Sequence, residues 1–305
     1  MDRFEAMSML LAVIDSGSFS AAGRVLRVPV ATLSRKVSEL EALLDAQLLI
    51  RTTRKLTLTD AGTTYVANAR RILEQLEEVE REAAGEFVEP KGELVITAPL
   101  FFGKRHVLPV VADFLAQFPD IRIRLLLTDH NVDLIGHRVD MAVRIGELPD
   151  SDMVATRIGS MRTIVCASPD LIGHHGLPKK PEDLLRFPCV AMEAPQPSPG
   201  WDFGPAAAVI AVKPRLSVST AEAALQAAIA GVGATRLLYY QVAEAIGEGT
   251  LMVLLEAFEP KPVPIHLLHA ARGHMPLKMR RFLDFAAPRL RQALADIAPA
   301  NATPP

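Results

Sequence analysis

The stretch VATLSRKVSELE, residues 30–41, combines an apolar helix face with a cationic outer face. Val30, Leu33 and Val37 recur at steps of three and four, which is the spacing of one buried face of a helix. At about 100° per residue, Arg35 points away from that face and has small outward neighbours. The stretch therefore predicts a helix that can approach a partner closely. A solvated surface helix has the same pattern, so the flanking sequence has to decide.

Two helices are predicted before this stretch. The first covers residues 1–17 and stops at Gly17. Ser18 is placed to cap a second helix by accepting a hydrogen bond from a free backbone N–H, and Pro29 is predicted to open the third helix. The predicted buried face of the first helix consists of Phe4, Met7, Leu10, Leu11 and Ile14. Helix, short turn and helix is the arrangement of DNA-binding helix-turn-helix proteins, whose second helix enters the major groove.

A basic hairpin is predicted directly after these helices, in LLIRTTRKLTLTDAG, residues 48–62. Two short β-prone runs, residues 48–50 and 56–58, flank the polar RTTRK segment, as in the wing of a winged helix. The cations Arg51, Arg54 and Lys55 would contact phosphates, and the hydroxyl groups of Thr52 and Thr53 would add donors. Any one exposed cation is usually only solvated. Helix, helix and basic hairpin at this spacing together favour DNA.

A long amphipathic helix is predicted from Thr59 or Asp60, either of which can cap it, to about Gly85. Its apolar residues alternate steps of four and three, which is a heptad pattern. They are Tyr65, Ala69, Ile72, Leu76, Val79 and Ala83. A heptad seam requires a partner helix, so the pattern predicts a dimer. Packing of the helix on its own domain remains the alternative for so short a seam.

Whole-chain composition hides a local charge asymmetry. The 305 residues carry a formal net charge of -2, yet residues 24–55 are rich in Lys and Arg and residues 74–89 are rich in Glu. The 2 cysteines form no metal-binding motif, so we expect no metal and no cofactor. The N-terminus lacks the basic region of a signal peptide, and no apolar run is long enough for a membrane span. These features predict a soluble cytoplasmic protein.

The last two thirds of the chain alternate predicted strands and helices after a short hinge at residues 90–92. Apolar runs such as ELVITA (93–98) and MAVRIG (141–146) read as strands, and HVLPVVADFLAQF (106–118) reads as a helix. This order indicates parallel sheets with helices on their faces, and the pattern restarts near residue 162. The fold class is therefore α/β overall, with two α/β lobes after an all-α N-terminal region.

The N-terminal motifs AVIDSGSFSAAGRVL, LSRKVSELEALL and LLIRTTRKLTLTDAG closely resemble those of the LysR-type transcriptional regulators, and the resemblance covers nearly the whole chain. It implies a winged helix-turn-helix, a linker helix for dimerisation and an effector domain like a periplasmic binding protein. The implied boundaries are 1–59 for the DNA-binding domain, 60–89 for the linker, and 90–305 for the effector domain. Lobe I would hold about 91–161 and 266–295, and lobe II about 162–265. The resemblance also implies tetramers built from two dimers.

The predicted DNA contacts depart from the family in one place. Many members open the recognition helix with Ser-Gln-Pro, whereas this chain has Pro29, Val30 and Ala31. Arg35 is then the first choice for a base edge, because a guanidinium pairs bidentately with guanine. The predicted DNA-binding residues are Thr32, Ser34, Arg35, Lys36, Arg51, Thr52, Thr53, Arg54 and Lys55.

The predicted effector site lies in the cleft that the resemblance implies between the lobes, beyond the carboxyl ends of strands. Its residues are Thr97, Pro99, Leu100, Thr128, Arg144, Trp201, Ser219 and Thr220. A structural ion pair is an equal alternative for Arg144, and a small separate core is an equal alternative for Trp201 and Phe203. The hydroxyl groups suggest a small carboxylate as effector. Cys166 is expected to be an inert core thiol.

The leading hypothesis is a sequence-specific transcriptional regulator that binds double-stranded promoter DNA and responds to a small-molecule effector. A solute-binding protein or a small-molecule enzyme with the same two-lobed fold is the alternative. The chain contains no GxSxG, P-loop, GxGxxG or HExxH motif, so we expect no enzyme. Salt-dependent binding to duplex DNA separates these hypotheses.

Overall fold

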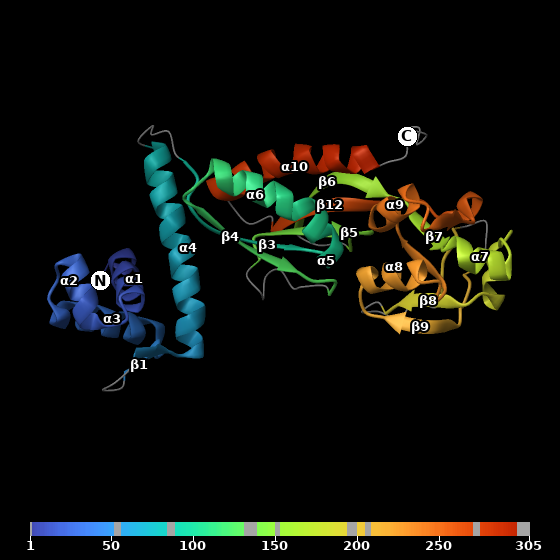
Figure 1. Ribbon diagram of the computed structural model, residues 1–305. Coiled ribbons are helices and arrows are strands. Elements are labelled where there is room, and N and C mark those ends of the chain that lie inside the picture. Colours follow the sequence, from blue (N-terminus) through green and yellow to red (C-terminus); the bar gives the residue numbers. More distant parts are fainter. Residues whose placement is uncertain are drawn as a thin grey trace. The chain divides into compact units, whose positions relative to one another are not determined.

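The computed structural model describes residues 2–51, 56–83, 89–130, 139–149, 153–193, 200–204, 209–270 and 275–297 (Figure 1). The chain divides into two compact units, Met1–Glu89 and Pro90–Pro305. Among the described residues, no single helix is long and apolar enough to cross a membrane; only the pair of the first two helices, bent by 119°, reaches that length and apolarity jointly.

The N-terminal unit is a winged helix-turn-helix followed by a long helix. Its elements are α1 (Arg3–Asp15), α2 (Phe19–Leu26), α3 (Val30–Leu44), β1 (Leu49–Arg51), β2 (Leu56–Leu58) and α4 (Asp60–Ala83). Ser18 caps α2 as predicted, since its Oγ accepts a hydrogen bond of 3.1 Å from the Ala21 N–H. Strands β1 and β2 pair antiparallel, which confirms the wing.

The buried face of α3 follows its sequence pattern except at Val30, the first residue of the helix, which is 44% exposed. Leu33, Val37 and Leu40 are 0% exposed, and α3 packs against α1. The face of α1 agrees only in part with the predicted one. Leu10 is buried and Leu11 and Ile14 pack against the core, but the other buried residues are Ala6, Met9 and Val13. Phe4, which the sequence places on that face, is 45% exposed. Helix α1 contacts α2, α3 and α4, and these three contacts decide which of its apolar residues are buried.

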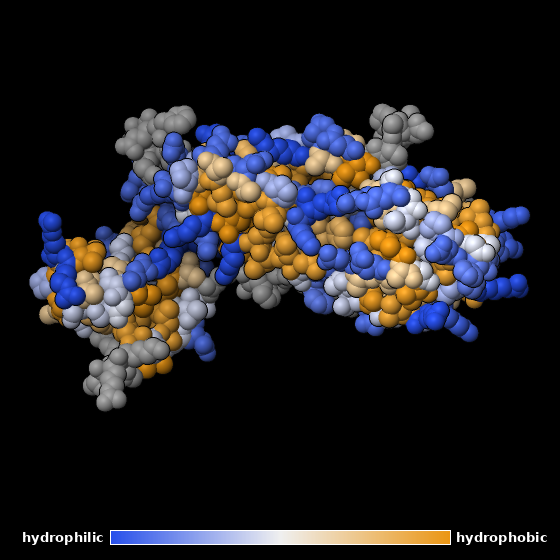
Figure 2. All heavy atoms as spheres, viewed as in Figure 1, coloured by the Kyte–Doolittle hydropathy of each residue, from blue (hydrophilic) through white to orange (hydrophobic). Residues whose placement is uncertain are grey.

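Helix α4 begins with a cap from Thr59, whose Oγ1 accepts a hydrogen bond of 2.9 Å from the Gly62 N–H. Its first turns belong to the unit's own core, where Val66 and Ala69 are buried. Farther along, Ile72 is 41% and Val79 is 52% exposed. Hydrophobic side chains, orange in Figure 2, interrupt the polar surface of this unit. Within the described part of this unit, Ile72 and Val79 of the distal seam are therefore not buried.

Lobe I is a five-stranded mixed sheet, ordered β4-β3-β5-β12-β6, with packed helices. Its strands are β3 (Gly92–Ala98), β4 (Ile121–Leu127), β5 (Met141–Ile145), β6 (Met153–Met161) and β12 (Val263–Ala270). Its helices are α5 (Leu100–Phe102), the π-helix η1 (Gly103–Val107), α6 (Leu108–Gln117) and α10 (Leu277–Ile297). Strands β3, β4 and β5 are parallel, and β12 runs antiparallel to β5 and β6.

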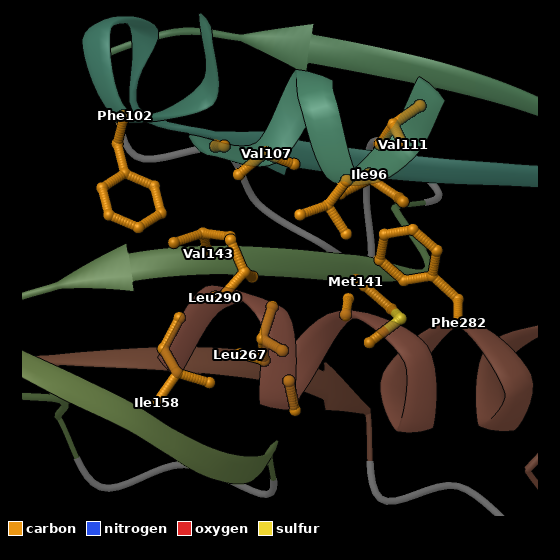
Figure 3. Close-up of a cluster of buried hydrophobic side chains, with 14 of the residues drawn as sticks. Ile96, Phe102, Val107, Val111, Met141, Val143, Ile158, Leu267, Phe282 and Leu290 are labelled. Carbon is orange, nitrogen blue, oxygen red and sulfur yellow. The ribbon is translucent and has the colours of Figure 1, made fainter. Parts of the chain in front are cut away.

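The core of lobe I fills the space between this sheet and helices α6 and α10 (Figure 3). Ile96 and Val143 come from the sheet, and Phe282 and Leu290 come from α10. The Phe114 and Phe282 rings meet edge to face with centroids 5.1 Å apart, which is a favourable aromatic geometry. This packing fixes the positions of the strand ends at which the effector residues are predicted.

Lobe II is a second five-stranded sheet, ordered β11-β7-β10-β8-β9. Its strands are β7 (Thr163–Ala167), β8 (Cys189–Met192), β9 (Pro214–Val218), β10 (Ala234–Leu238) and β11 (Met252–Leu254). Its helices are α7 (Pro169–His175), η2 (Pro181–Arg186), α8 (Ala221–Ile229), α9 (Tyr239–Gly247) and η3 (Glu256–Phe258). One hydrophobic cluster lies under α8 and α9, and another covers the opposite face of the sheet. The two-lobed α/β class is confirmed.

The chain passes from lobe I to lobe II and back again. Strand β6 of lobe I ends at Met161, and β7 of lobe II begins at Thr163. The chain returns into β12 at Val263. The stretch VDLIGHRVD (132–140) also predicts a short helix, but most of it lies outside the described residues.

Candidate DNA-binding and effector-binding sites

Arg35 lies on the outer face of α3, where the sequence places it. Its side chain is 68% exposed and forms an ion pair with Glu39, one turn along the helix, at 3.8 Å. A solvent-exposed pair at this distance contributes little to stability, so the guanidinium is available to a partner. Thr32 and Ser34 are partly exposed on the first turns of α3. These side chains form an exposed polar face on a rigid helix.

Lys36 has a different environment from Arg35. Its side chain is 17% exposed, and its Nζ lies 2.5 Å from Glu5 Oε2 of α1. This ion pair joins the first and third helices and engages the ammonium group. The predicted DNA contact of Lys36 therefore competes with a scaffold interaction.

The wing residues are only partly described. The backbone of Arg51 ends β1 in a pair with Leu56. Thr52, Thr53, Arg54 and Lys55 lie outside the described residues, as does the side chain of Arg51. The base of the hairpin is tied to the start of α4, because the Thr59 N–H donates to Leu48 O at 3.0 Å. The predicted phosphate contacts of the wing stay predictions.

Four predicted effector residues lie at the carboxyl ends of β3 and β4. Thr97 is fully buried, and its Oγ1 donates to Leu126 O at 3.0 Å, so its hydroxyl hydrogen is already used. Thr128 Oγ1 accepts from the His130 N–H at 3.2 Å. Pro99 precedes α5, and the Leu100 N–H donates to Asp129 Oδ1 at 2.9 Å. The two strands are in direct register, so these residues form one cluster.

Arg144 lies in β5 of the same sheet, directly opposite His266 of β12. Its side chain is partly buried, and burial lowers the pKa of the guanidinium below its ordinary value. Burial, and to a smaller extent Arg157, also lowers the pKa of His266 below its ordinary value. An arginine stays protonated even after such a shift. Arg144 therefore supplies the positive charge of this pair on the lobe I sheet.

The predicted residues of lobe II divide into two groups. Ser219 is exposed, and Thr220 caps α8 by accepting a hydrogen bond of 3.3 Å from the Ala223 N–H. Trp201 is 8% exposed and Phe203 is 4% exposed, and both belong to the hydrophobic cluster beside β7 and β10. The structure thus places these rings in a separate core, which is the alternative that the sequence leaves open. Trp201 also lines a cavity of lobe II.

The crossover and the contact between the lobes involve residues that the sequence does not single out. Arg162, in the first crossover, bonds Glu259 at 2.7 Å and Glu256 at 2.6 Å and stacks on the Tyr239 ring. His106 of η1 packs against the Tyr240 ring of α9 with centroids 5.5 Å apart. A π-helix often marks a functional site. Spacing alone gives no signal for these residues, because their partners are distant in sequence.

Two further ion pairs connect η1 of lobe I to helices of lobe II. Lys104 Nζ lies 3.2 Å from Glu222 Oε1, and Arg105 Nη1 lies 2.9 Å from Glu244 Oε2. All four side chains are well exposed, so each pair contributes at most about 1 kcal/mol. These exposed pairs therefore add little to the stability of the lobe arrangement.

The two cysteines are expected to be unreactive in the folded protein. Cys166 and Cys189 are 0% exposed, and burial raises the thiol pKa to about 12 and about 11. A thiolate is the reactive species, so neither thiol should react quickly with Ellman's reagent at pH 8. Both should react after denaturation. Rapid titration of either thiol in the native protein would contradict this expectation.

No group of three or more His, Cys, Asp or Glu residues able to hold a metal occurs in the part of the chain that the structure describes. The geometry is that of an exposed helix face with a wing, followed by two lobes joined at crossovers. Such an arrangement can bind a nucleic-acid groove and a small molecule.

Comparison with known proteins agrees with this geometry. Residues 4–63 match the family model of the bacterial regulatory helix-turn-helix proteins of the lysR family, and residues 88–291 match the LysR substrate binding domain. The regulator CrgA of Neisseria meningitidis is 32% identical over 288 residues, which are 94% of this chain and 96% of that protein. A regulator of Xanthomonas campestris is 44% identical over 173 residues, 56% of this chain and 50% of that protein.

The solved structure of CrgA has the same architecture as this chain. It is 31% identical, aligns with a TM-score of 0.61, and the match covers 94% of this chain and 98% of that one. The full-length structure of the Vibrio cholerae virulence activator AphB aligns with a TM-score of 0.57 at 27% identity, over 93% of this chain and 98% of that one.

Proposed function

Because the chain belongs to the LysR family of DNA-binding transcriptional regulators, we propose that α3 reads promoter DNA through the exposed face that carries Arg35. An α-helix fits the major groove, and arginine bound to guanine is the commonest specific contact there. The single observation that supports this assignment is the outward, 68% exposed guanidinium on a helix whose opposite face is fully buried. Thr32 and Ser34 would add contacts beside it, and the wing residues 51–55 would bind phosphates.

The effector domain would respond to a small molecule held between the lobes. We place the predicted residues of lobe I, Thr97 to Leu100 with Thr128 and Arg144, on one side of that site. Ser219 and Thr220 would lie on the other side. Hydroxyl groups, a helix N-terminus and a partly buried arginine favour a small carboxylate as effector. A ligand can regulate the protein in this way only if it binds the two lobe arrangements unequally.

The proposed assembly is a homodimer through α4, with two dimers forming a tetramer. The exposed Ile72 and Val79 of the distal seam support it, because an apolar seam at heptad spacing gains stability when a second helix covers it. We propose that the protein acts in the cytoplasm and is not an enzyme. Residues 1–59, 60–89 and 90–305 would serve as DNA-binding head, linker and effector domain.

The variant Arg35→Ala tests the DNA contact. We expect it to weaken binding to the operator by about 1–3 kcal/mol and to bind random duplex almost as well as the wild type, because a base contact carries sequence information. Fluorescence anisotropy on both duplexes measures this difference. The variant Glu39→Gln is the matched control, since it removes the intrahelical partner of Arg35 but leaves the guanidinium. Equal losses on operator and random DNA would make Arg35 a phosphate contact instead.

A further inference from the structure

Lobe II contains a cavity whose lining, among the described residues, comes from lobe II alone. Its volume is about 730 Å³, which falls within the usual range for small-molecule sites. The lining combines apolar side chains with few polar groups; it includes Thr163, Met192, Trp201, Val212, Arg236 and Leu238. Of the predicted effector residues, only Trp201 takes part.

Strand geometry places Arg236 on the Trp201 side of the lobe II sheet. Side chains two residues apart in a strand share a face. Ala234 belongs to the cluster of Trp201, whereas Leu237 belongs to the cluster under α8 and α9. Arg236 of β10 therefore points to the Trp201 face, opposite Val165 of β7. The backbone of Trp201 is fixed over this face by two hydrogen bonds with Ile210, of 2.8 and 2.9 Å.

The Arg236 guanidinium lies partly buried in this cavity. Burial lowers its pKa, and the carboxylate of Asp202 acts on it in the opposite direction from a distance. Within the described ranges, its side chain makes no hydrogen bond or ion pair. Arg162, in the same lobe, differs because two carboxylates bond it directly. A partly buried cation without a bonded counter-charge is unfavourable, so an anionic ligand would stabilise it.

We propose that this cavity binds a small organic carboxylate, whose charged group pairs with Arg236 and whose apolar body lies beside Trp201 and Leu238. The site is contained in lobe II and does not require the cleft between the lobes or DNA binding. Glu193 is at the exposed rim, where it selects against a second negative charge on the ligand. Thr163 directly follows the crossover residue Arg162, so a ligand here contacts the segment that joins the lobes.

Tryptophan fluorescence can report binding at this site, because Trp201 lines the cavity and is the single tryptophan of the sequence. The full-length protein is titrated with sodium cyclohexanecarboxylate and, separately, with the uncharged cyclohexanecarboxamide, while Trp201 emission is recorded. Neither probe absorbs where tryptophan is excited. We expect a saturable change with the carboxylate and at least about tenfold weaker binding of the amide, as for loss of a charge-assisted hydrogen bond.

Variants separate the pocket from general charge effects. Arg236→Met should weaken carboxylate binding at least about tenfold, and Arg236→Lys should retain part of it. Arg186→Met removes an exposed cation of the same lobe that does not line the cavity and should bind like the wild type. If Arg236→Met does not fold, the Arg236→Lys variant and the two titrations of the wild type test whether Arg236 binds the carboxylate. Equal binding of both probes, unchanged affinity in the Arg236 variants, or no saturable change up to about 10 mM would overturn the proposal.

Discussion

Replacing Gly62 with alanine is expected to destabilise the N-terminal unit by about 3 kcal/mol, which is the upper range for overpacking a core. A Cβ at Gly62 would lie 2.0 Å from Leu48 O and 2.9 Å from Leu48 C. Both are backbone atoms, so rotation of a side chain cannot relieve the clash. Leu48 O also accepts hydrogen bonds from Thr59, and any shift of β1 would weaken the cap of α4.

Hydrogen exchange measured by mass spectrometry tests this expectation on peptides that cover residues 48–69. Exchange in Gly62→Ala should be faster there, and operator binding should be lost in parallel, because the wing and α4 no longer dock. Gly173→Ala is the matched control. Gly173 lies in helix α7 with no atom within 4 Å of an added Cβ, so alanine there should be neutral or stabilise by up to about 1 kcal/mol. Equal exchange in both variants would contradict the close contact.

The second large effect is a loss of effector-domain stability in mild acid, caused by His106. Its imidazole is 7% exposed between Phe102 and Tyr240, and its Nε2 has no hydrogen-bond partner among the described residues. Burial, and to a smaller extent Arg105, lowers the pKa of His106 to about 4 from 6.5. The unfolded chain therefore takes up this proton first. Above pH 6.5 His106 is neutral in both states and does not lower the free energy of unfolding. As the pH falls from 6.5 toward 4, the free energy of unfolding decreases.

This loss should reach about 3 kcal/mol, since one pKa unit corresponds to about 1.4 kcal/mol. Urea unfolding followed by Trp201 emission at pH 7, 6, 5 and 4.5 measures it. The variant His106→Phe keeps an aromatic ring against Tyr240 but removes the titrating group, so its stability should depend less on pH. The other histidines are the same in both proteins and cancel in the comparison. Identical pH dependence of the two proteins would exclude His106 as the cause.

Sequence patterns predict the N-terminal unit well because its elements are short-range. The α2 cap, the α3 face and the wing strands each depend on residues within a few positions of one another. The face of α1 is less predictable, since most of its surface is apolar and the contacts with α2, α3 and α4 choose the buried side. Lys36 shows the same limit: its partner Glu5 is 31 residues away, and only the fold brings them together.

The sequence predicts the fold class of the effector domain, but it predicts fewer of the individual strands and cavity residues. Strand β10 (ATRLL) and strand β6 (MVATRIGSM) lack clear alternation, and the sequence does not single them out. Arg236 has the same sequence pattern as Arg144, because each is a lone cation in an otherwise apolar strand. The sequence cannot show that Arg236 lines a cavity, because Trp201 and Val212 reach it from a distant segment. The DNA-binding and effector residues stay predictions that the variants above test.

The most direct test of the central claim is fluorescence anisotropy of the purified protein on the intergenic duplex beside its own gene, with a scrambled duplex as control. Titrations at several salt concentrations give log K against log salt. We expect tighter binding to the native duplex and a slope that steepens by about 0.9 for each phosphate contact. The contradicting result is an intact dimer that binds neither duplex, in which case the exposed face of α3 is only solvated.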